Sequence, residues 1–281
     1  MQNFQPISAK QGVHVYRCDY GGVPAVVKYF ENEDDRREIL NYRILARHGV
    51  PTIAPYAMGS ATIVLEDVSV SEEWRLGVAE DLEDTDVAKS LAQWYFAFHE
   101  SGAAAAELDA LYFEYDSLTE ENLIKLEQKF PEAGELFRFV SAHCGRFREL
   151  ICAPSFTLTY NDFYWSNFVV RKDKTAAKMF DYNLLGRGYR FSDFRNVRGS
   201  MSEEAGAAFA ETYHRLYFAK HGRNRTEEEK FEERVDDVAG PLFALLVAFT
   251  EREDIPDWAE EHKDDAVNGK LLIKAKGLLL S

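Results

Sequence analysis

The sequence predicts an α+β protein in which a strand-rich N-terminal part precedes a mainly helical remainder. Residues 1–66 contain short apolar and β-branched runs separated by turn residues, which is typical of strands. From residue 71 onward, apolar residues recur at helical spacing over long stretches. Residues 157–181 are the exception, because three short apolar runs alternate there with turns. We therefore expect a second group of strands within the helical part.

Composition indicates an ordinary globular protein. The 281 residues are 46% hydrophobic and 14% aromatic, which is sufficient for a large core. The longest apolar run, 238–250, contains Gly240 and Pro241 and is too short to span a bilayer. No basic segment followed by an apolar core marks a secretory signal, and the three cysteines lack metal-ligand spacing. We expect a cytoplasmic protein with reduced thiols.

The net charge of −15 disfavours nucleic acid and anionic membranes as partners. An acidic cleft would concentrate a cationic substrate. Net acidity also serves solubility alone, and the charge by itself does not separate these two explanations.

A hairpin followed by a strand with one lysine is predicted near the N-terminus. Residues 13–18 alternate loosely between apolar and polar side chains and end at 19–22, a turn with two glycines. The next strand, 23–30, carries Lys28 near its end. A lysine among apolar neighbours usually needs an anionic partner, such as a phosphate or a carboxylate on the following helix. The alternative is an edge-strand lysine that points to water.

A helix follows, beginning near the acidic residues 33–35 and ending at 48–51, His-Gly-Val-Pro. Glu38 lies about one turn into this helix, where it could pair with Lys28 or face solvent. Residues 62–65 form another buried-type strand, which ends at 66–68. We place the domain boundary here, between an N-terminal domain of residues 1–66 and a C-terminal domain of residues 67–281.

The helical part shows several capped, amphipathic segments. One apolar stripe lies between Asp84 or Thr85 as cap and Gly102 as end. Five more helices are predicted: a helix capped by Ser117 in a capping box and ending before Pro131, a helix from Pro131 to about Ile151, a helix capped by Ser202 over 203–221, a helix opened by Thr226, and a last helix over 258–280. Pro241 should kink or interrupt the helix opened by Thr226.

Polar residues stand where the central strands end. Asp162 follows the run 156–159, Asn167 opens the run that ends at Val170, and Asp181 follows the run 176–180. Strand ends hold functional groups on a rigid support. Asp162 and Asn167 also have the D-x-x-x-x-N spacing of a kinase catalytic loop. In that template the Asp accepts a hydroxyl proton, while the Asn and a later Asp hold magnesium.

Together with Lys28, Glu38 and residues 66–68, this ordered set resembles the aminoglycoside phosphotransferase and choline kinase superfamily. Residues 159–167, TYNDFYWSN, are similar to the family's catalytic loop, and 179–182, MFDY, to its metal-binding segment. The resemblance extends from Ser8 to about Tyr213. It implies a bilobal protein-kinase-like fold with a small antiparallel-sheet N-lobe and a mainly helical C-lobe.

The resemblance also assigns the reacting groups. Asp162 would orient and deprotonate the hydroxyl of the substrate, and Asn167 and Asp181 would ligate Mg²⁺. Asp193 corresponds to a downstream aspartate that supports the catalytic loop by hydrogen bonds, although an N-cap of the following helix explains it equally well.

For the nucleotide, the resemblance implies that Lys28, fixed by Glu38, holds the α- and β-phosphates of ATP. The backbone at Glu66 and Val68 would bind adenine. The segment that contains Gly12 would cover the phosphates.

The chain departs from the family at several positions. Tyr160 stands where family members usually have His, and Asn161 is closer to choline kinases than to aminoglycoside kinases, which usually have Gly. Residues 10–12, KQG, replace a full glycine-rich loop. Two further absences argue against a protein kinase: no arginine precedes Asp162, and too few residues separate Asp181 from Asp193 for a long activation segment.

The favoured function is ATP- and Mg²⁺-dependent phosphorylation of a hydroxyl on a small, amine-bearing molecule of the aminoglycoside or choline type. Trp165, Tyr164 and Tyr189 could stack on an ammonium group or a sugar ring. Carboxylates that could pair with amines, although each is individually typical of a solvated surface, are Glu203, Glu204, Asp254, Asp257, Glu260 and Glu261. Two alternatives remain open: a kinase-like protein that binds nucleotide without transferring phosphate, and a helical interaction protein.

Overall fold

The computed structural model describes residues 1–252 and 255–281. They form two compact units. The first unit contains residues 1–111, 157–187 and 192–224, and the second contains residues 112–156, 188–191 and 225–281. The boundary predicted at residue 66 falls inside the first unit, where the N-terminal sheet and the helices after it share one hydrophobic core.

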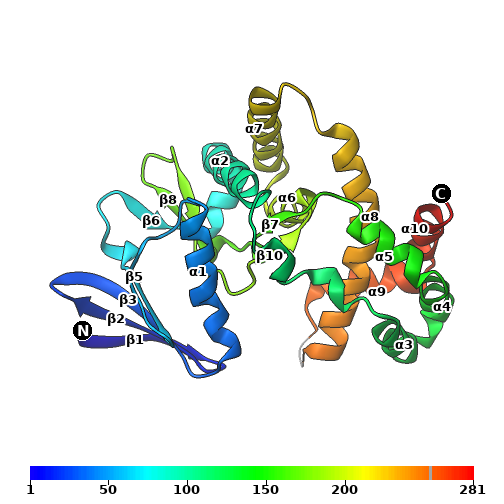
Figure 1. Ribbon diagram of the computed structural model, residues 1–281, viewed down its shortest axis with the longest axis horizontal. Coiled ribbons are helices and arrows are strands. Elements are labelled where there is room, and N and C mark those ends of the chain that lie inside the picture. Colours follow the sequence, from blue (N-terminus) through cyan, green and yellow to red (C-terminus); the bar gives the residue numbers. More distant parts are fainter. Residues whose placement is uncertain (253–254) are drawn as a thin grey trace. The chain divides into compact units, whose positions relative to one another are not determined.

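Within residues 1–66 the first unit has a five-stranded antiparallel sheet with strand order β1-β2-β3-β5-β4 (Figure 1). The strands are β1 (Gln2–Lys10), β2 (Val13–Tyr20), β3 (Val23–Phe30), β4 (Pro55–Met58) and β5 (Thr62–Glu66). Tyr20 pairs with Val23 across the turn, and Gly21 and Gly22 both have positive φ, 66° and 92°. Glycine adopts such angles without steric cost, so the predicted hairpin closes here.

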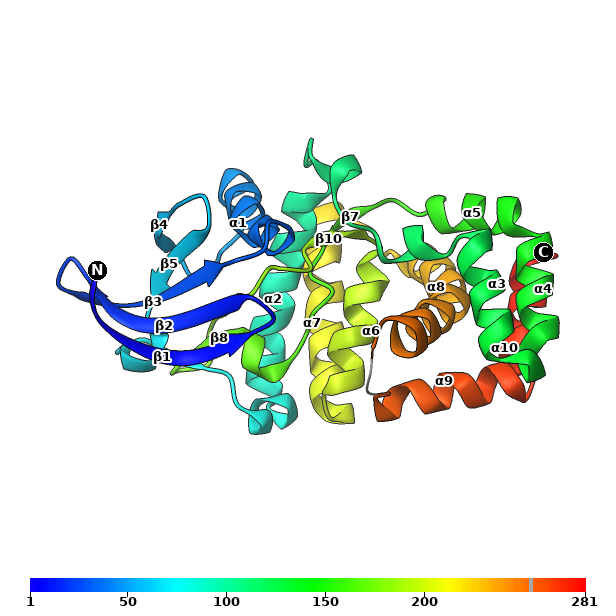
Figure 2. The ribbon, with the colours of Figure 1, turned by 90° about the horizontal axis from the view of Figure 1, so that it is seen from below.

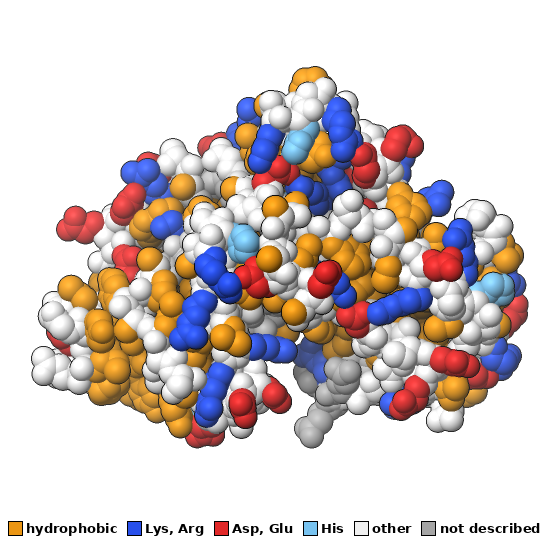
Figure 3. All heavy atoms as spheres, in the orientation of Figure 1, with side chains coloured by type: hydrophobic (Ala, Val, Ile, Leu, Met, Phe, Trp, Pro, Cys, Tyr) orange, Lys and Arg blue, Asp and Glu red, His pale blue; other side chains and the backbone are white. Residues whose placement is uncertain are grey.

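One face of this sheet packs on helix α1 (Arg37–Arg47), which follows a 3₁₀ turn at Asp34–Arg36 (Figure 1). Phe30 and Ile63 of the sheet share a core with Ile39 and Tyr42 of α1. The other face has a smaller apolar cluster around Val27 and Val64. Hydrophobic side chains also lie exposed on these strands, and they gather over the sheet at the left of Figure 3; they include Phe4, Ile7, Val23 and Tyr29.

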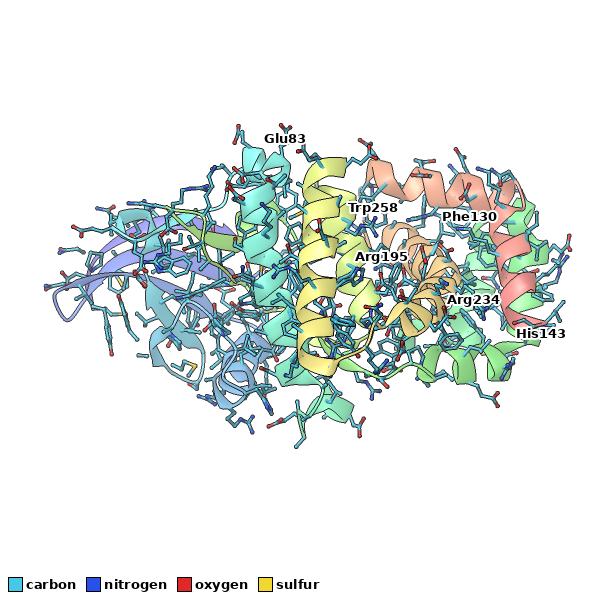
Figure 4. The ribbon with its side chains drawn as sticks, turned by 90° about the horizontal axis from the view of Figure 1, so that it is seen from above. Glu83, Phe130, His143, Arg195, Arg234 and Trp258 are labelled. Carbon is cyan, nitrogen blue, oxygen red and sulfur yellow. The ribbon has the colours of Figure 1, made fainter. Side chains whose placement is uncertain are left out.

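Helices α2 (Thr85–Gly102) and α7 (Glu203–His221) lie side by side in the first unit (Figures 2 and 4). The carboxylate of Asp84 accepts the backbone N–H groups of Asp86 and Val87, so Asp84 caps α2. The hydroxyl of Ser202 accepts Ala205 N–H, as predicted for the cap of α7. The predicted N-terminal caps of α2 and α7 are both confirmed.

The predicted central strands are present. They are β7 (Thr157–Thr159), β8 (Phe168–Arg171) and β9 (Ala177–Met179). The pattern missed two short strands, β6 (Trp74–Leu76), which pairs with β8, and β10 (Gly186–Gly188), which pairs with β7. Helix α6 (Arg190–Ser200) follows β10. The predicted α+β class is confirmed.

The second unit is helical. Its helices are α3 (Glu120–Lys129), α4 (Gly134–Ala142), α5 (Cys144–Cys152), α8 (Thr226–Leu246), α9 (Asp257–Val267) and α10 (Lys270–Leu279). Phe137, Val140, Leu242 and Leu245 lie in its core and are fully buried.

One predicted cap is wrong. Helix α3 begins at Glu120, and the side chain of Thr119 caps it by accepting Asn122 N–H at 3.2 Å. Ser117 instead donates its hydroxyl to Glu114 O. The helix predicted to open at Thr226 begins there as α8, and the residue before it, Arg225, makes no side-chain cap. A hydroxyl residue followed three residues later by Glu therefore does not by itself identify the N-cap of a helix. The hydroxyl can form a different local hydrogen bond, as that of Ser117 does, and a neighbouring residue then becomes the N-cap.

Two predicted long helices are each divided. Between Pro131 and Ile151 a 3₁₀ turn and two helices occur, with the break at His143, where Nδ1 lies 2.9 Å from Phe139 O. The last predicted helix is divided at Gly269, whose φ of 82° is outside the helical region. Helix α8 by contrast continues through Pro241.

No helix in the described ranges combines the length and apolar character needed to cross a membrane. The cysteines Cys18, Cys144 and Cys152 are free.

Candidate active site

All five principal predicted groups, Lys28, Glu38, Asp162, Asn167 and Asp181, lie in the first unit. The loop that carries Asp162 begins where β7 ends. Asp193 of α6 supports this loop, because its carboxylate accepts the backbone N–H groups of Tyr160 and Asn161 at 3.1 and 3.2 Å. Asp193 therefore bonds to the loop backbone, the role that the resemblance implies.

A buried histidine supports Asp193 in turn. His99 Nε2 of α2 lies 3.0 Å from Asp193 Oδ2, and both side chains are buried. Burial raises the pKa of Asp193 to about 7, and the two backbone donors oppose this shift. Sequence reasoning missed His99, since a lone histidine on the apolar face of a helix carries no local signal for a partner almost a hundred residues away.

Asn161 adopts a left-handed backbone with φ of 66°. Only Gly and, less easily, Asn or Asp tolerate this conformation. Its side-chain amide donates to Leu184 O at 3.0 Å. The departure noted at this position, Asn where aminoglycoside kinases usually have Gly, is therefore compatible with the turn and adds a bond that Gly cannot make.

Asn167 contacts Asp162 directly. Its Nδ2 donates to Asp162 Oδ2 at 3.0 Å and to Asp162 O at 3.1 Å. A 3₁₀ turn, Trp165–Asn167, brings the amide back to the carboxylate. Because the NH₂ group serves Asp162, the Oδ1 of Asn167 is the atom suited to a cation. Burial and, to a smaller extent, the charge of Asp181 raise the pKa of Asp162 to about 6, against the opposing effects of the bond from Asn167 and the charge of Lys28.

Asp181 follows β9 in a left-handed conformation with φ of 60°. Its segment is attached to the loop, since Phe180 N–H donates to Asn167 O at 3.0 Å and the hydroxyl of Tyr160 donates to Phe180 O at 2.5 Å. Tyr160 is fully buried. The tyrosine that replaces the family histidine is therefore buried beside the predicted metal-binding segment and bonds to its backbone.

Lys28 of strand β3 contacts two carboxylates, that of Glu38 on α1 and that of Asp181 after β9. Its Nζ lies 2.6 Å from Glu38 Oε2 and 3.0 Å from Asp181 Oδ1. The side chain of Lys28 is 12% exposed and that of Glu38 is 1% exposed. Burial opposes the charge of Lys28, but the two carboxylates together raise its pKa. Burial also raises the pKa of Glu38 to about 7, against the attraction of Lys28.

The segment predicted to bind adenine is held by a residue that the sequence did not single out. Asp67, between Glu66 and Val68, is buried and accepts Arg17 Nε and Ser69 N–H, both at 3.0 Å. This fixes the backbone at the end of β5. The sequence feature that could have revealed Asp67 is its place at the end of a strand, two residues before Ser69. An Asp at such a position often accepts the backbone N–H two residues later and so forms a turn.

Gly12 lies in a tight turn between β1 and β2, with φ of 50° at Gln11 and 82° at Gly12. A Cβ on Gly12 would lie 2.5 Å from Asn32 Nδ2, and this amide donates to Gln11 O. The glycine is therefore required by the turn itself.

Two of the three predicted aromatic contacts are available near Asp162. Tyr164 is 56% exposed, Trp165 is half-buried, and their rings lie 5.6 Å apart. Tyr189 differs, because it is fully buried in the second unit and donates its hydroxyl to Ile151 O at 2.6 Å. No ring face of Tyr189 is free for an acceptor, so we exclude it from the site.

The candidate amine-pairing carboxylates are divided between the units. Glu203 and Glu204 are exposed at the start of α7 in the first unit, and Asp257, Glu260 and Glu261 are exposed on α9 in the second unit. Asp254 lies outside the described residues.

Within the described part of the chain, no three His, Cys, Asp or Glu side chains are grouped so as to hold a metal by themselves. Asp181 and Asn167 offer one carboxylate and one amide oxygen. These are hard oxygen donors of the kind that Mg²⁺ accepts together with water and substrate phosphates. The donor chemistry therefore fits a magnesium ion that arrives with a nucleotide.

A family model described as "Phosphotransferase enzyme family" matches residues 3–230. The chain belongs to this phosphotransferase family. A comparison with curated proteins finds no match.

Solved structures similar to this phosphotransferase include small-molecule kinases. Macrolide 2′-phosphotransferase from Brachybacterium faecium is 17% identical, with 94% of this chain and 92% of that chain covered and a TM-score of 0.60. Plasmodium vivax ethanolamine kinase is 13% identical, with 97% and 84% covered and a TM-score of 0.62. Choline kinase from Streptococcus pneumoniae is 14% identical, with 97% and 94% covered and a TM-score of 0.60, and a structure of it with AMP also matches. The predicted superfamily and kinase-like fold are confirmed.

Proposed function

We propose that this phosphotransferase is an ATP- and Mg²⁺-dependent kinase that phosphorylates a hydroxyl group of a small, cationic molecule. One observation carries the proposal: Lys28 Nζ, on a strand near the N-terminus, lies 3.0 Å from Asp181 Oδ1, which follows a strand far along the chain. Asn167 bonds Asp162 in the adjoining loop. A cation for phosphates, a metal-binding pair and a base therefore lie in one unit.

The nucleotide would be held by groups from several elements. Lys28, oriented by Glu38, would bind the α- and β-phosphates, and the backbone at Glu66 and Val68 would bind adenine. Gly12 would place the β1–β2 turn over the phosphates. Mg²⁺ would be held by Asp181 and Asn167, and when bound it neutralises charge on the phosphate oxygens.

Asp162 would accept the proton of the acceptor hydroxyl. Its pKa of about 6 leaves it ionised at neutral pH yet close to the operating pH, which favours a general base. The hydroxyl oxygen would form a bond to the γ-phosphorus, the bond from that phosphorus to the ADP oxygen would break, and the proton would go to Asp162. Transfer would be direct and in line, without a phospho-enzyme.

The acceptor would be a small alcohol that carries an amine. The exposed ring of Tyr164 and the half-buried ring of Trp165, next to Asp162 in sequence, suit a cationic head group. The net charge of −15 also favours a cation over an anion. The choline, ethanolamine and macrolide kinases of similar structure support a small-molecule acceptor.

A second candidate is a kinase-like protein that binds nucleotide without transferring phosphate. The tight Gln11–Gly12 turn favours it, because a two-residue turn offers fewer backbone N–H groups to the phosphates than a glycine-rich loop does.

Transfer from γ-labelled ATP decides between these candidates. The purified protein would be assayed with choline, ethanolamine, an aminoglycoside and a macrolide, with and without Mg²⁺. We expect Mg²⁺-dependent transfer to at least one acceptor, and Asp162→Ala should lower turnover by roughly 10²–10⁴-fold. The matched control is Asp173→Ala, which removes an exposed carboxylate in the β8–β9 turn.

Stabilisation by Mg-ATP without transfer to any acceptor would favour the second candidate. Full activity of Asp162→Ala on a verified acceptor would show that another group is the base.

A further inference from the structure

Helix α1 presents three buried side chains to the metal-binding segment: Glu38, Asn41 and Tyr42. Their spacing of three and four residues places them on one face of the helix. Glu38 is 1%, Asn41 5% and Tyr42 1% exposed. The first of them acts through Lys28, which contacts both Glu38 and Asp181. The other two contact Tyr182, the residue after Asp181.

Asn41 makes the polar contact. Its Nδ2 donates to Tyr182 O at 2.7 Å, and this bond joins residues far apart in sequence. A carbonyl oxygen can only accept, so the identity of the donor atom is determined by the partner. Tyr42 supports the same contact through its ring, which meets the Tyr182 ring edge to face at 5.0 Å.

The bond acts on a segment whose backbone conformation is uncommon. Asp181 has φ of 60°, which L-residues rarely adopt unless the surroundings impose it. The carbonyl before Asp181 accepts the hydroxyl of Tyr160 at 2.5 Å. The carbonyl of the residue after it accepts Asn41. Donors from two different elements therefore hold both sides of Asp181.

We infer that Asn41 is a positioning residue, which fixes the metal-binding segment to α1 and so holds Asp181 in the orientation that receives the nucleotide-bound cation. The inference rests on the proposed function, since it takes Asp181 as the cation ligand. Without this bond Asp181 occupies the competent orientation for a smaller fraction of the time, and apparent affinity falls by that fraction.

The test uses Asn41→Leu in the full chain, because leucine has a similar volume and no donor. The probe is a non-hydrolysable ATP analogue, and its dissociation constant is measured by calorimetry with Mg²⁺ and with EDTA. We expect affinity with Mg²⁺ to fall by about tenfold, the equivalent of one buried hydrogen bond. Affinity in EDTA should stay within about twofold, because Asp181 then has no cation to bind.

Two further variants make the result decisive. Leu40→Ala changes the neighbouring, 56% exposed residue of α1 and should match the wild type in both conditions. Asn41→Ala removes the donor without adding a buried charge. It should repeat the loss, and it replaces Asn41→Leu if that variant does not fold.

Four outcomes are distinguishable. A loss confined to the Mg²⁺ condition supports the inference. Unchanged affinity, or equal losses with and without Mg²⁺, overturns it and leaves the proposed function intact. If the wild type binds no Mg-nucleotide at all, the proposed function fails and the inference fails with it.

Discussion

Asn161, Asp162 and Asp181 each carry a local cost that the surrounding structure must offset. Asn161 and Asp181 adopt left-handed backbones, which cost on the order of 1 kcal/mol each for residues other than glycine. Asp162 is a largely buried carboxyl whose pKa is raised to about 6. Hydrogen bonds from Tyr160, Asn167 and the loop backbone hold these unfavourable states in place. Such a concentration of costs is typical of a functional site.

The raised pKa of Asp162 predicts that Asp162→Asn is more stable than the wild type at neutral pH. The pKa of Asp162 has its ordinary value of 3.8 in the unfolded chain and a value of about 6 in the folded protein. The folded state therefore binds more protons between these values, and wild-type stability falls as pH rises through this window. Asparagine does not ionise, so the stability of Asp162→Asn does not fall in this way as pH rises. We expect an advantage of about 1–3 kcal/mol above pH 6, which disappears below about pH 4.

Urea unfolding of both proteins from pH 4 to pH 8 measures this difference. Asp173→Asn is the control: hydrogen bonds from Thr175 lower the pKa of the exposed Asp173, so this variant should gain no advantage over the wild type as pH rises. Equal stability of Asp162→Asn and the wild type at pH 8 would mean that burial does not penalise the ionised Asp162.

At the scale of elements, the end of α2 packs closely against the strand that leads into the proposed catalytic loop. Gly102, the last residue of α2, lies against β7, the strand that leads into the loop. A Cβ on Gly102 would lie 2.5 Å from Leu158 N and 2.6 Å from Leu158 Cβ. Two backbones approach here more closely than any other residue allows. The hydroxyl of Thr157 adds a bond to His99 O at 2.6 Å.

Gly102→Ala should therefore destabilise the protein by about 1–3 kcal/mol, because an overpacked core site must shift either α2 or β7. It should also lower phosphotransfer, since displacement of β7 moves Asp162. Gly277→Ala in α10 is the matched control. Nothing lies within 4 Å of its added Cβ, and alanine in a helix stabilises by roughly 0.5–1 kcal/mol. Equal effects of the two variants on unfolding would show that Leu158 moves aside freely.

At the scale of the whole chain, the net charge is the property that bears on the proposed cationic acceptor. The net charge of −15 is far from neutral, and the proposed catalytic groups all belong to the first unit. The exposed carboxylates of Glu203 and Glu204 are in that unit as well. A field of one sign raises the local concentration of an oppositely charged ligand.

We predict that kcat/KM for a cationic acceptor falls by about threefold or more as the salt concentration rises from 10 mM to 300 mM, because the Debye length shortens from roughly 30 Å to below 10 Å. An uncharged analogue of the same alcohol should be nearly unaffected. Steady-state kinetics on the acceptor pair at several salt concentrations tests this. A parallel response of both acceptors would exclude charge attraction as the basis of acceptor choice.

Much of the architecture follows from short-range patterns. The Gly21–Gly22 turn, the Asp84 cap and the apolar stripe of α2 depend on neighbours within a few residues, and all were predicted correctly. Errors came where two local options compete, as at Thr119 in place of Ser117 and at Gly269 within the last predicted helix. The order of the candidate residues, and hence the family, was also readable from sequence.

Sequence alone determined the class of the fold, because hydrophobic periodicity and turn residues depend on near neighbours in the chain. It also determined the family and the candidate residues, because the order and spacing of the motifs can be read directly from the sequence. Only the tertiary structure decided that Lys28 contacts Asp181 and that Asn41 bonds the Tyr182 carbonyl. It also buried Tyr189 and so removed it from the acceptor site. The chemistry of a side chain determines what kind of partner it requires, such as a hydrogen-bond acceptor or an apolar surface. Which residue becomes that partner depends on the distant segments that the packed core brings together.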